Sequence, residues 1–168
     1  MVTLRSMTHR PAATRVFSYS ALFLALIAAI LALAPAAHAA SIDVVDGEVA
    51  IAANNSCSLI EAIINANNNA ATHTDCTAGS GADVINLPAA STFTLTTSLG
   101  YFDGETGTPV ISSPITIEGN GSTITRGGGN TLRLLTVNSS GNLTLNDLTL
   151  SNGLSGGGPG GGMGGMDF

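Results

Sequence analysis

Short apolar runs that alternate with threonine constrain the fold of this chain more than any other feature. They occupy residues 84–87, 93–96, 115–117, 123–125, 134–137, 143–145 and 148–150. Alternation of apolar and polar residues with a period of two predicts strands with one buried face. Gly, Asn, Ser and Pro fill the gaps and favour tight turns. The body of the chain is therefore predicted to be all-β.

The spacing of the runs predicts a repeating architecture. Ile85, Ile115 and Leu143 lie in similar runs, with steps of 30 and 28 residues between them. Such steps, each holding two or three short strands, are typical of solenoids, in which every coil buries the face of its neighbour. A β-sandwich is the alternative, because it also contains strands every 8–12 residues or so. The shortness of the strands, the Asn and Gly corners and the scarcity of aromatic residues favour a solenoid of about three coils.

The first 39 residues are typical of a signal peptide. Arg5, Arg10 and Arg15 form a basic region, an apolar segment covers 21–34, and Ala37–Ala39 forms a small-residue cleavage site. A transmembrane anchor is the alternative, but the apolar segment is short for a span. We therefore expect cleavage after this site, no membrane span in the mature chain, and secretion to the extracellular space or cell surface.

Cleavage leaves a strongly acidic mature chain without lysine. Arg126 and Arg133 then oppose all eleven acidic residues, which gives a formal net charge of −9. Such a chain cannot neutralise a run of phosphates. Nucleic acid is therefore excluded as a partner, and an anionic membrane surface is disfavoured for the same reason.

Residues 57–63 predict the start of a helix. Ser58 and Glu61 have the spacing of a capping box, in which each side chain accepts from the backbone amide of the other. Residues 59–66 give an apolar helical face, and three asparagines at 67–69 provide an end. A helix of about ten residues is marginal alone. We expect it to dock on the first coil and to cover the open end of the strand stack.

Cys57 and Cys76 are the two cysteines of the chain, and both follow the predicted cleavage site. In an oxidising compartment they are expected to form a disulfide, which is worth on the order of 3 kcal/mol for a loop of this size. A metal site with His73 is the alternative. Two cysteines with eighteen residues between them and a single histidine make a poor ligand set, so the disulfide is preferred.

These segments together resemble the N-terminal region of exported bacterial CSLREA-domain proteins. The resemblance rests on residues 57–63, 83–88, 92–96, 115–121 and 143–153 and spans about 41–158. Those proteins are similar to right-handed parallel β-helix proteins of the pectin-lyase-like fold, and many carry a C-terminal surface anchor. The resemblance therefore implies an all-β, right-handed parallel β-helix with an N-terminal capping helix. Ile60 stands where the motif usually has arginine.

The expected organisation has four parts. They are a signal peptide at 1–39, an N-terminal strand with capping helix and disulfide loop at 40–83, coils at 84–153, and a disordered Gly-rich tail at 154–168. The tail is interpreted either as a flexible tether or as the mark of a truncated or frame-shifted product that lacks later coils. The β-helix is then incomplete at its C-terminus, and its open end predicts self-association.

No catalytic residue, cofactor or metal is predicted. The two mature arginines stand apart from any aspartate cluster, and no pair of aspartates suggests a glycoside hydrolase. Asp43 and Asp46, and likewise Asp103 and Glu105, are weak calcium candidates, because carboxylates suit hard cations. Neither group has the spacing of a known calcium loop, so both are interpreted as ordinary acidic turns.

These observations favour an exported, non-catalytic structural or adhesive surface protein. Its expected partner is an extracellular glycan or a cell surface. The alternative is a truncated polysaccharide lyase or glycoside hydrolase of the pectin-lyase-like fold, with its active site in coils that this chain lacks. A shared fold does not decide between them.

Overall fold

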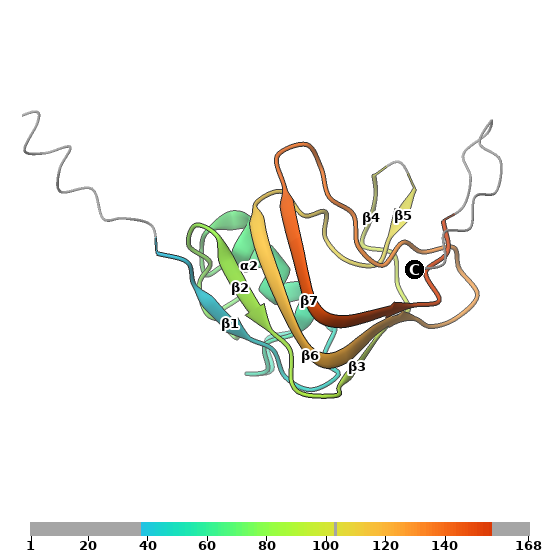
Figure 1. The fold of residues 1–168 in the computed structure, drawn as a ribbon, viewed down its shortest axis with the longest axis horizontal. Helices are drawn as coiled ribbons and strands as arrows, with labels where there is room; N and C mark the ends of the chain where they lie inside the picture. The colour runs from blue at the N-terminus through green and yellow to red at the C-terminus, as the bar shows by residue number, and fades with distance from the viewer. Residues whose placement is uncertain (1–37, 103, 156–168) are drawn as a thin grey trace, which may run out of the picture. The chain divides into compact units, whose positions relative to one another are not determined.

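The computed structural model describes residues 38–102 and 104–155 (Figure 1). The predicted signal peptide lies outside the described residues except for its last two positions. The Gly-rich tail lies outside them from residue 156 onward. Among the described residues, no helix has the length and apolarity that a membrane crossing requires.

A five-stranded parallel sheet forms the centre of the fold. Its strands are β1 (Ser41–Asp43), β2 (Asp83–Asn86), β3 (Thr92–Leu95), β6 (Pro114–Arg126) and β7 (Asn142–Ser151). The first half of β6 pairs with β2 and its second half with β3, while β7 pairs with both halves of β6 (Figure 1). Strand β1 extends the sheet beyond β2.

Alternation within the strands separates a buried face from an outward face. Ile42, Ile85 and Ile117 occupy one row across β1, β2 and β6, and each is fully buried. Phe93 and Ile124 form an equivalent buried row across β3 and the second half of β6. The polar residues between them face outward, as the period-two pattern predicts.

Helix α2 (Leu59–Asn68) belongs to the same core as the sheet. Its side chains Leu59, Ala62, Ile63 and Ala66 are fully buried. The C-cap Asn69 adopts the left-handed conformation, with φ of 48°. The helix therefore begins and ends where the sequence predicted, because the capping residues fix both ends.

The predicted all-β, right-handed parallel β-helix of about three coils is wrong. The described residues form a small α/β arrangement with one short helix and one five-stranded parallel sheet. The open β-helix end, on which the predicted self-association depended, is therefore not a feature of this fold.

One cause of the error is that pairs of runs join into single strands. The runs 115–117 and 123–125 are both part of β6, and 143–145 and 148–150 are both part of β7. The expected turn between the first two is a bulge instead. Asn120 and Gly121 have φ values of 52° and 75°, and the register with β7 shifts there while the strand continues.

A second cause is that the run 134–137 forms no strand. It makes one isolated bridge, between Ile111 and Val137. The remaining short strands, β4 (Gly100–Tyr101) and β5 (Glu105–Thr106), pair antiparallel with each other. Leu143 pairs with Ile115, which lies 28 residues before it, but Ile85 pairs with Ile117 rather than with Ile115.

Candidate functional site

The capping box at the start of α2 is complete and buried. Ser58 Oγ accepts from the Glu61 amide at 3.1 Å, and Glu61 Oε2 accepts from the Ser58 amide at 3.1 Å. Glu61 Oε1 also accepts from the Ala52 amide at 3.0 Å, and the residue is only 1% exposed. The carboxylate thus joins the helix start to the segment that precedes it.

Cys57 and Cys76 form a disulfide, so neither sulfur is free to ligate a metal ion. The loop that the disulfide closes is also held by Asn65, which is fully buried. Its Nδ2 donates to the carbonyl oxygens of His73 at 2.9 Å and of Thr77 at 3.1 Å. Its Oδ1 accepts from the His73 amide at 2.8 Å. These contacts make the helix and the disulfide loop one structural unit.

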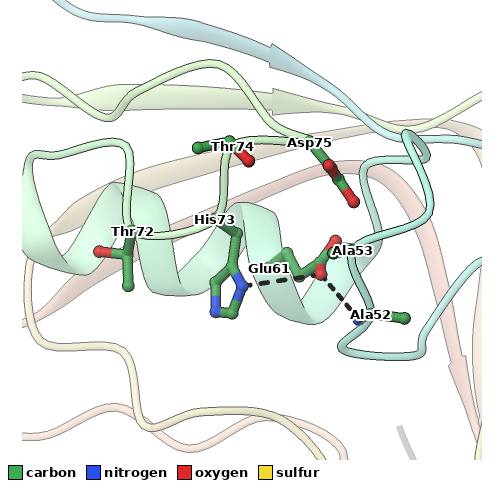
Figure 2. Close-up of a pocket in the computed structure, with 7 residues that line it drawn as sticks. All are labelled: Ala52, Ala53, Glu61, Thr72, His73, Thr74 and Asp75. Carbon is green, nitrogen blue, oxygen red and sulfur yellow. Dashed lines mark hydrogen bonds and ion pairs between the residues drawn. The ribbon is translucent and has the colours of Figure 1, made fainter.

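A small pocket of about 170 Å³ lies beside this unit (Figure 2). It is lined by Ala52, Ala53, Glu61, Thr72, His73, Thr74 and Asp75. His73 Nδ1 points toward Glu61 Oε1 at 3.7 Å, and the His73 side chain is 25% exposed (Figure 2). Asp75 Oδ2 accepts from the amides of Asn54 at 2.8 Å and Asn55 at 3.1 Å.

The contacts of this pocket are structural. Both of its carboxylates accept hydrogen bonds from backbone amides of the segment 52–55. The hydrogen-bonding capacity of these carboxylates is therefore used to hold the loop.

Two of the four calcium candidates, Asp43 and Asp46, bond to neighbouring side chains. Asp43 Oδ1 accepts from Asn86 Nδ2 at 2.8 Å, and Asp46 Oδ1 accepts from Ser91 Oγ. Glu105 is an exposed residue of β5, and Asp103 lies outside the described residues. Within 38–102 and 104–155, no three His, Cys, Asp or Glu side chains gather to hold a metal ion.

The two arginines bind loop carbonyls. Arg126 donates from Nε to Asn152 O at 2.7 Å and from Nη1 to Gly128 O at 2.6 Å. Arg133 donates from Nη1 to Phe102 O at 3.2 Å. Both guanidinium groups therefore connect loops in this structure.

The outward face of the sheet differs between its two halves. Across β1, β2 and the first halves of β6 and β7, one row carries Asp43, Asn86, Glu118 and Asn146. Its amides and carboxylates bond to each other, since Asn86 Nδ2 donates to Asp43 and Asn146 Nδ2 donates to Glu118 Oε1, each at 2.8 Å. This row is charged, and its amides and carboxylates satisfy one another.

The second half carries a regular array of hydroxyl groups, which we name the threonine face. It consists of Thr92, Thr94, Thr123, Thr125, Thr149 and Ser151. Strand pairing places Thr92, Thr123 and Thr149 in one row, and Thr94, Thr125 and Ser151 in the next. Neighbouring parallel strands lie about 4.8 Å apart, and residues i and i+2 of one strand about 6.6 Å apart. The array therefore repeats in two directions.

Most hydroxyls of the threonine face are open to an external partner. Among the described residues, only Thr125 has a hydrogen-bond partner for its side chain, the Nδ2 of Asn152 at 3.1 Å. Thr92, Thr94 and Thr149 are exposed, and the other three members of the face are half-buried. None of the six side chains carries a charge.

Sequence reasoning found the strands of this face but not the face itself. The available signal was a recurring Thr-x-Thr or Thr-x-Ser at 92–94, 123–125 and 149–151. Only the pairing of distant strands brings these triplets side by side. No protein-family model, no curated protein and no solved structure matches this chain.

Proposed function

We propose that the mature chain is an exported, non-catalytic adhesive protein that docks through the threonine face onto an extended, uncharged surface. The observation that carries the proposal is the array of neutral hydroxyls, of which only Thr125 has a partner within the described residues. An extracellular glycan layer is the partner expected from the sequence. The predicted signal peptide, the disulfide and the resemblance to exported CSLREA-domain proteins support export.

The form of the face favours a surface over a small molecule. Sites for small ligands are concave and enclose most of the ligand. The threonine face belongs to a sheet and repeats along and across the strands. A ligand with its own repeat can contact several rows at once, and such multivalent contact strengthens attachment.

The engagement of the acidic residues supports a non-catalytic role. Hydrolysis of glycosides requires two carboxyl groups that flank a substrate bond. Glu61 and Asp75 bind backbone amides, and Asp43 and Asp46 bind neighbouring side chains. No contact among residues 38–102 and 104–155 specifically favours the lyase or hydrolase alternative.

Adsorption of the mature protein to insoluble surfaces tests the proposal. The intact gene is expressed in an exporting host, and the purified mature protein is mixed with microcrystalline cellulose, with chitin and with ice. We expect depletion from solution by at least one of these surfaces and equal depletion at low and high salt, because an uncharged face is not screened. Failure to adsorb to all three, loss of adsorption at high salt, or release of soluble sugar would contradict the proposal.

A further inference from the structure

We infer that removal of the predicted signal peptide completes an internal ion pair, between the new α-amino group of Ala40 and the buried carboxylate of Asp83. In the described part of the chain, the backbone nitrogen of Ala40 donates to Asp83 Oδ1 at 2.9 Å, while Asp83 Oδ2 is buried without a hydrogen-bond partner. Asp83 faces the core, so this pair is separate from the outward threonine face.

Asp83 is a buried carboxylate that lacks a cationic partner. It begins β2, on the side of the strand that points into the core, and is only 1% exposed. Its Oδ1 accepts from the amide of Ala40 and, at 2.8 Å, from the amide of Ser80. The one ion pair within residues 38–102 and 104–155 joins His73 to Glu61 instead. Burial of a carboxylate is costly unless it is paired, so Asp83 lies where a positive charge is favoured.

The predicted cleavage site lies directly beside this carboxylate. His38 and Ala39 are exposed, whereas Ala40 is half-buried and packs against the core. The carbonyl oxygen of Ala40 accepts from the Val84 amide at 2.8 Å. The peptide bond between Ala39 and Ala40 therefore joins an exposed residue to one that the sheet holds. Cleavage there leaves β1 whole, because β1 begins one residue later.

Cleavage changes the donor at Asp83 without moving it. Hydrolysis by a signal peptidase adds one water across the bond, so that Ala39 leaves with a new carboxylate and the nitrogen of Ala40 becomes an ammonium near neutral pH. A backbone amide offers one hydrogen, whereas an ammonium offers three. One retains the bond to Oδ1, a second can reach Oδ2 of the same carboxylate, and the third is left to solvent. The product is a charge-assisted contact, which is stronger than the amide contact that it replaces.

The ion pair fastens an edge strand that is otherwise short. Strand β1 has three residues, lies at the edge of the sheet and pairs with β2. Short elements near a chain end open with little cost in free energy. Attachment of Ala40 to Asp83 holds this strand, with its buried Ile42, at its first residue. The mature protein is therefore expected to be more stable than the precursor, which offers Asp83 only an amide.

The sequence allows a direct test, because it contains no lysine. After cleavage the α-amino group is the single primary amine of the chain, so an amine-reactive ester labels this group alone. The protein is expressed in an exporting host, and the intact mass and N-terminal sequence of the purified product are determined first. We expect Ala40 as the first residue, and any other first residue would overturn the inference.

The rate of amine labelling then measures the ion pair, with a peptide of residues 40–43 in the same buffer as reference. We expect the folded mature protein to react about tenfold more slowly than the peptide, because the paired amine stays protonated and shielded. Asp83→Asn keeps an acceptor for the backbone donors but removes the charge, so its rate should approach that of the peptide. Asp43→Asn, which removes an exposed carboxylate of β1, should keep the wild-type protection. A wild-type rate equal to that of the peptide, or equal protection in the two variants, would overturn the inference.

Acetylation of the single amine in the unfolded mature protein separates the ion pair from the fold. It restores an amide at Ala40, as in the precursor, and keeps the wild-type sequence, so this comparison stands even if Asp83→Asn does not fold. We expect the refolded acetylated protein to unfold at a lower denaturant concentration than the free-amine protein, with failure to refold as the extreme of the same effect. We also expect Asp83→Asn to lower the midpoint in the free-amine form alone. Equal midpoints with and without the acetyl group, or an equal effect of Asp83→Asn on both forms, would show that Asp83 only binds backbone amides.

Discussion

At the residue scale, single buried side chains satisfy several backbone groups at once. Glu61 accepts from the amides of Ser58 and Ala52 and lies beside His73, although it is only 1% exposed. A buried amide that loses its acceptor costs the full desolvation penalty of that group. The stability of the helix start therefore depends strongly on this one carboxylate.

Replacement of Glu61 by alanine should lower the free energy of unfolding by about 3 kcal/mol, because the buried amide of Ser58 and the partly buried contact to the Ala52 amide both lose their acceptor. The matched control is Glu48→Ala. Glu48 also accepts from a nearby amide, that of Ala50 at 2.8 Å, but in an exposed contact, so its loss should cost less than about 1 kcal/mol. Denaturant titration measures both, and equal losses would contradict this role of Glu61.

At Gly79 the backbone passes so close to helix α2 that there is no room for a side chain. A Cβ at this position would lie 2.2 Å from Asn65 O and 2.7 Å from Ala66 Cα. Backbone of a buried helix cannot move away cheaply, so Gly79→Ala should cost about 3 kcal/mol. Gly129→Ala is the control, since a Cβ there meets nothing within 4 Å. A melting temperature unchanged in the first variant would show that the loop adapts.

At the element scale, the helix and the disulfide loop depend on each other. Asn65 connects them through its side chain, and the disulfide connects Cys57 to Cys76. Short-range signals were sufficient to predict this unit, because a capping box, an apolar helical face and two cysteines all act within twenty-five residues or so. The role of Asn65 was missed, since asparagine on an apolar face gives no sign of the loop that it binds.

Asn65→Ala should destabilise the protein by about 3 kcal/mol, because its buried contact to the Cys76 carbonyl and its partly buried contacts to His73 and Thr77 are all lost. Asn68→Ala is the matched control on the same helix. Asn68 bonds Thr72 in an exposed contact, so its replacement should change stability by less than about 0.5 kcal/mol. If thermal unfolding gives the same midpoint for both variants, the side chain of Asn65 does not hold the loop.

Removal of the disulfide by the double change Cys57→Ser and Cys76→Ser should cost about 3 kcal/mol, as expected for a sequence separation of 19 residues. Unfolding of the oxidised protein with and without reductant provides the same comparison without mutation. A denaturation midpoint that is insensitive to reductant would contradict a stabilising disulfide.

The sheet was less predictable than the helix, for a physical reason. Alternation shows which side chains are buried, but it does not say which runs are continuous or which pair. Asn120 and Gly121 have the composition of a turn and form a bulge within β6. The run 134–137 has the pattern of a strand and makes only an isolated bridge. Both errors concern long-range pairing, which local composition does not encode.

At the scale of the whole molecule, one sheet presents two different outward surfaces. The half with Asp43 and Glu118 carries a charged row whose amides and carboxylates pair with one another, while the threonine face leaves most hydroxyls open. Both halves share β6 and β7, so the same substitution can be made at an outward position of either half of one strand. Two such variants should lose similar amounts of stability, so a difference in their binding reports on the surface and not on folding.

The most direct test of the account compares adsorption of Thr123→Glu and Thr116→Glu to the insoluble surface that the wild-type protein binds best. Both residues are half-buried on the outward side of β6, so both variants should unfold at similar temperatures. We predict that a charge at position 123 abolishes adsorption and that a charge at position 116 leaves it unchanged. Equal adsorption by two folded variants would contradict the claim that the threonine face is the binding surface.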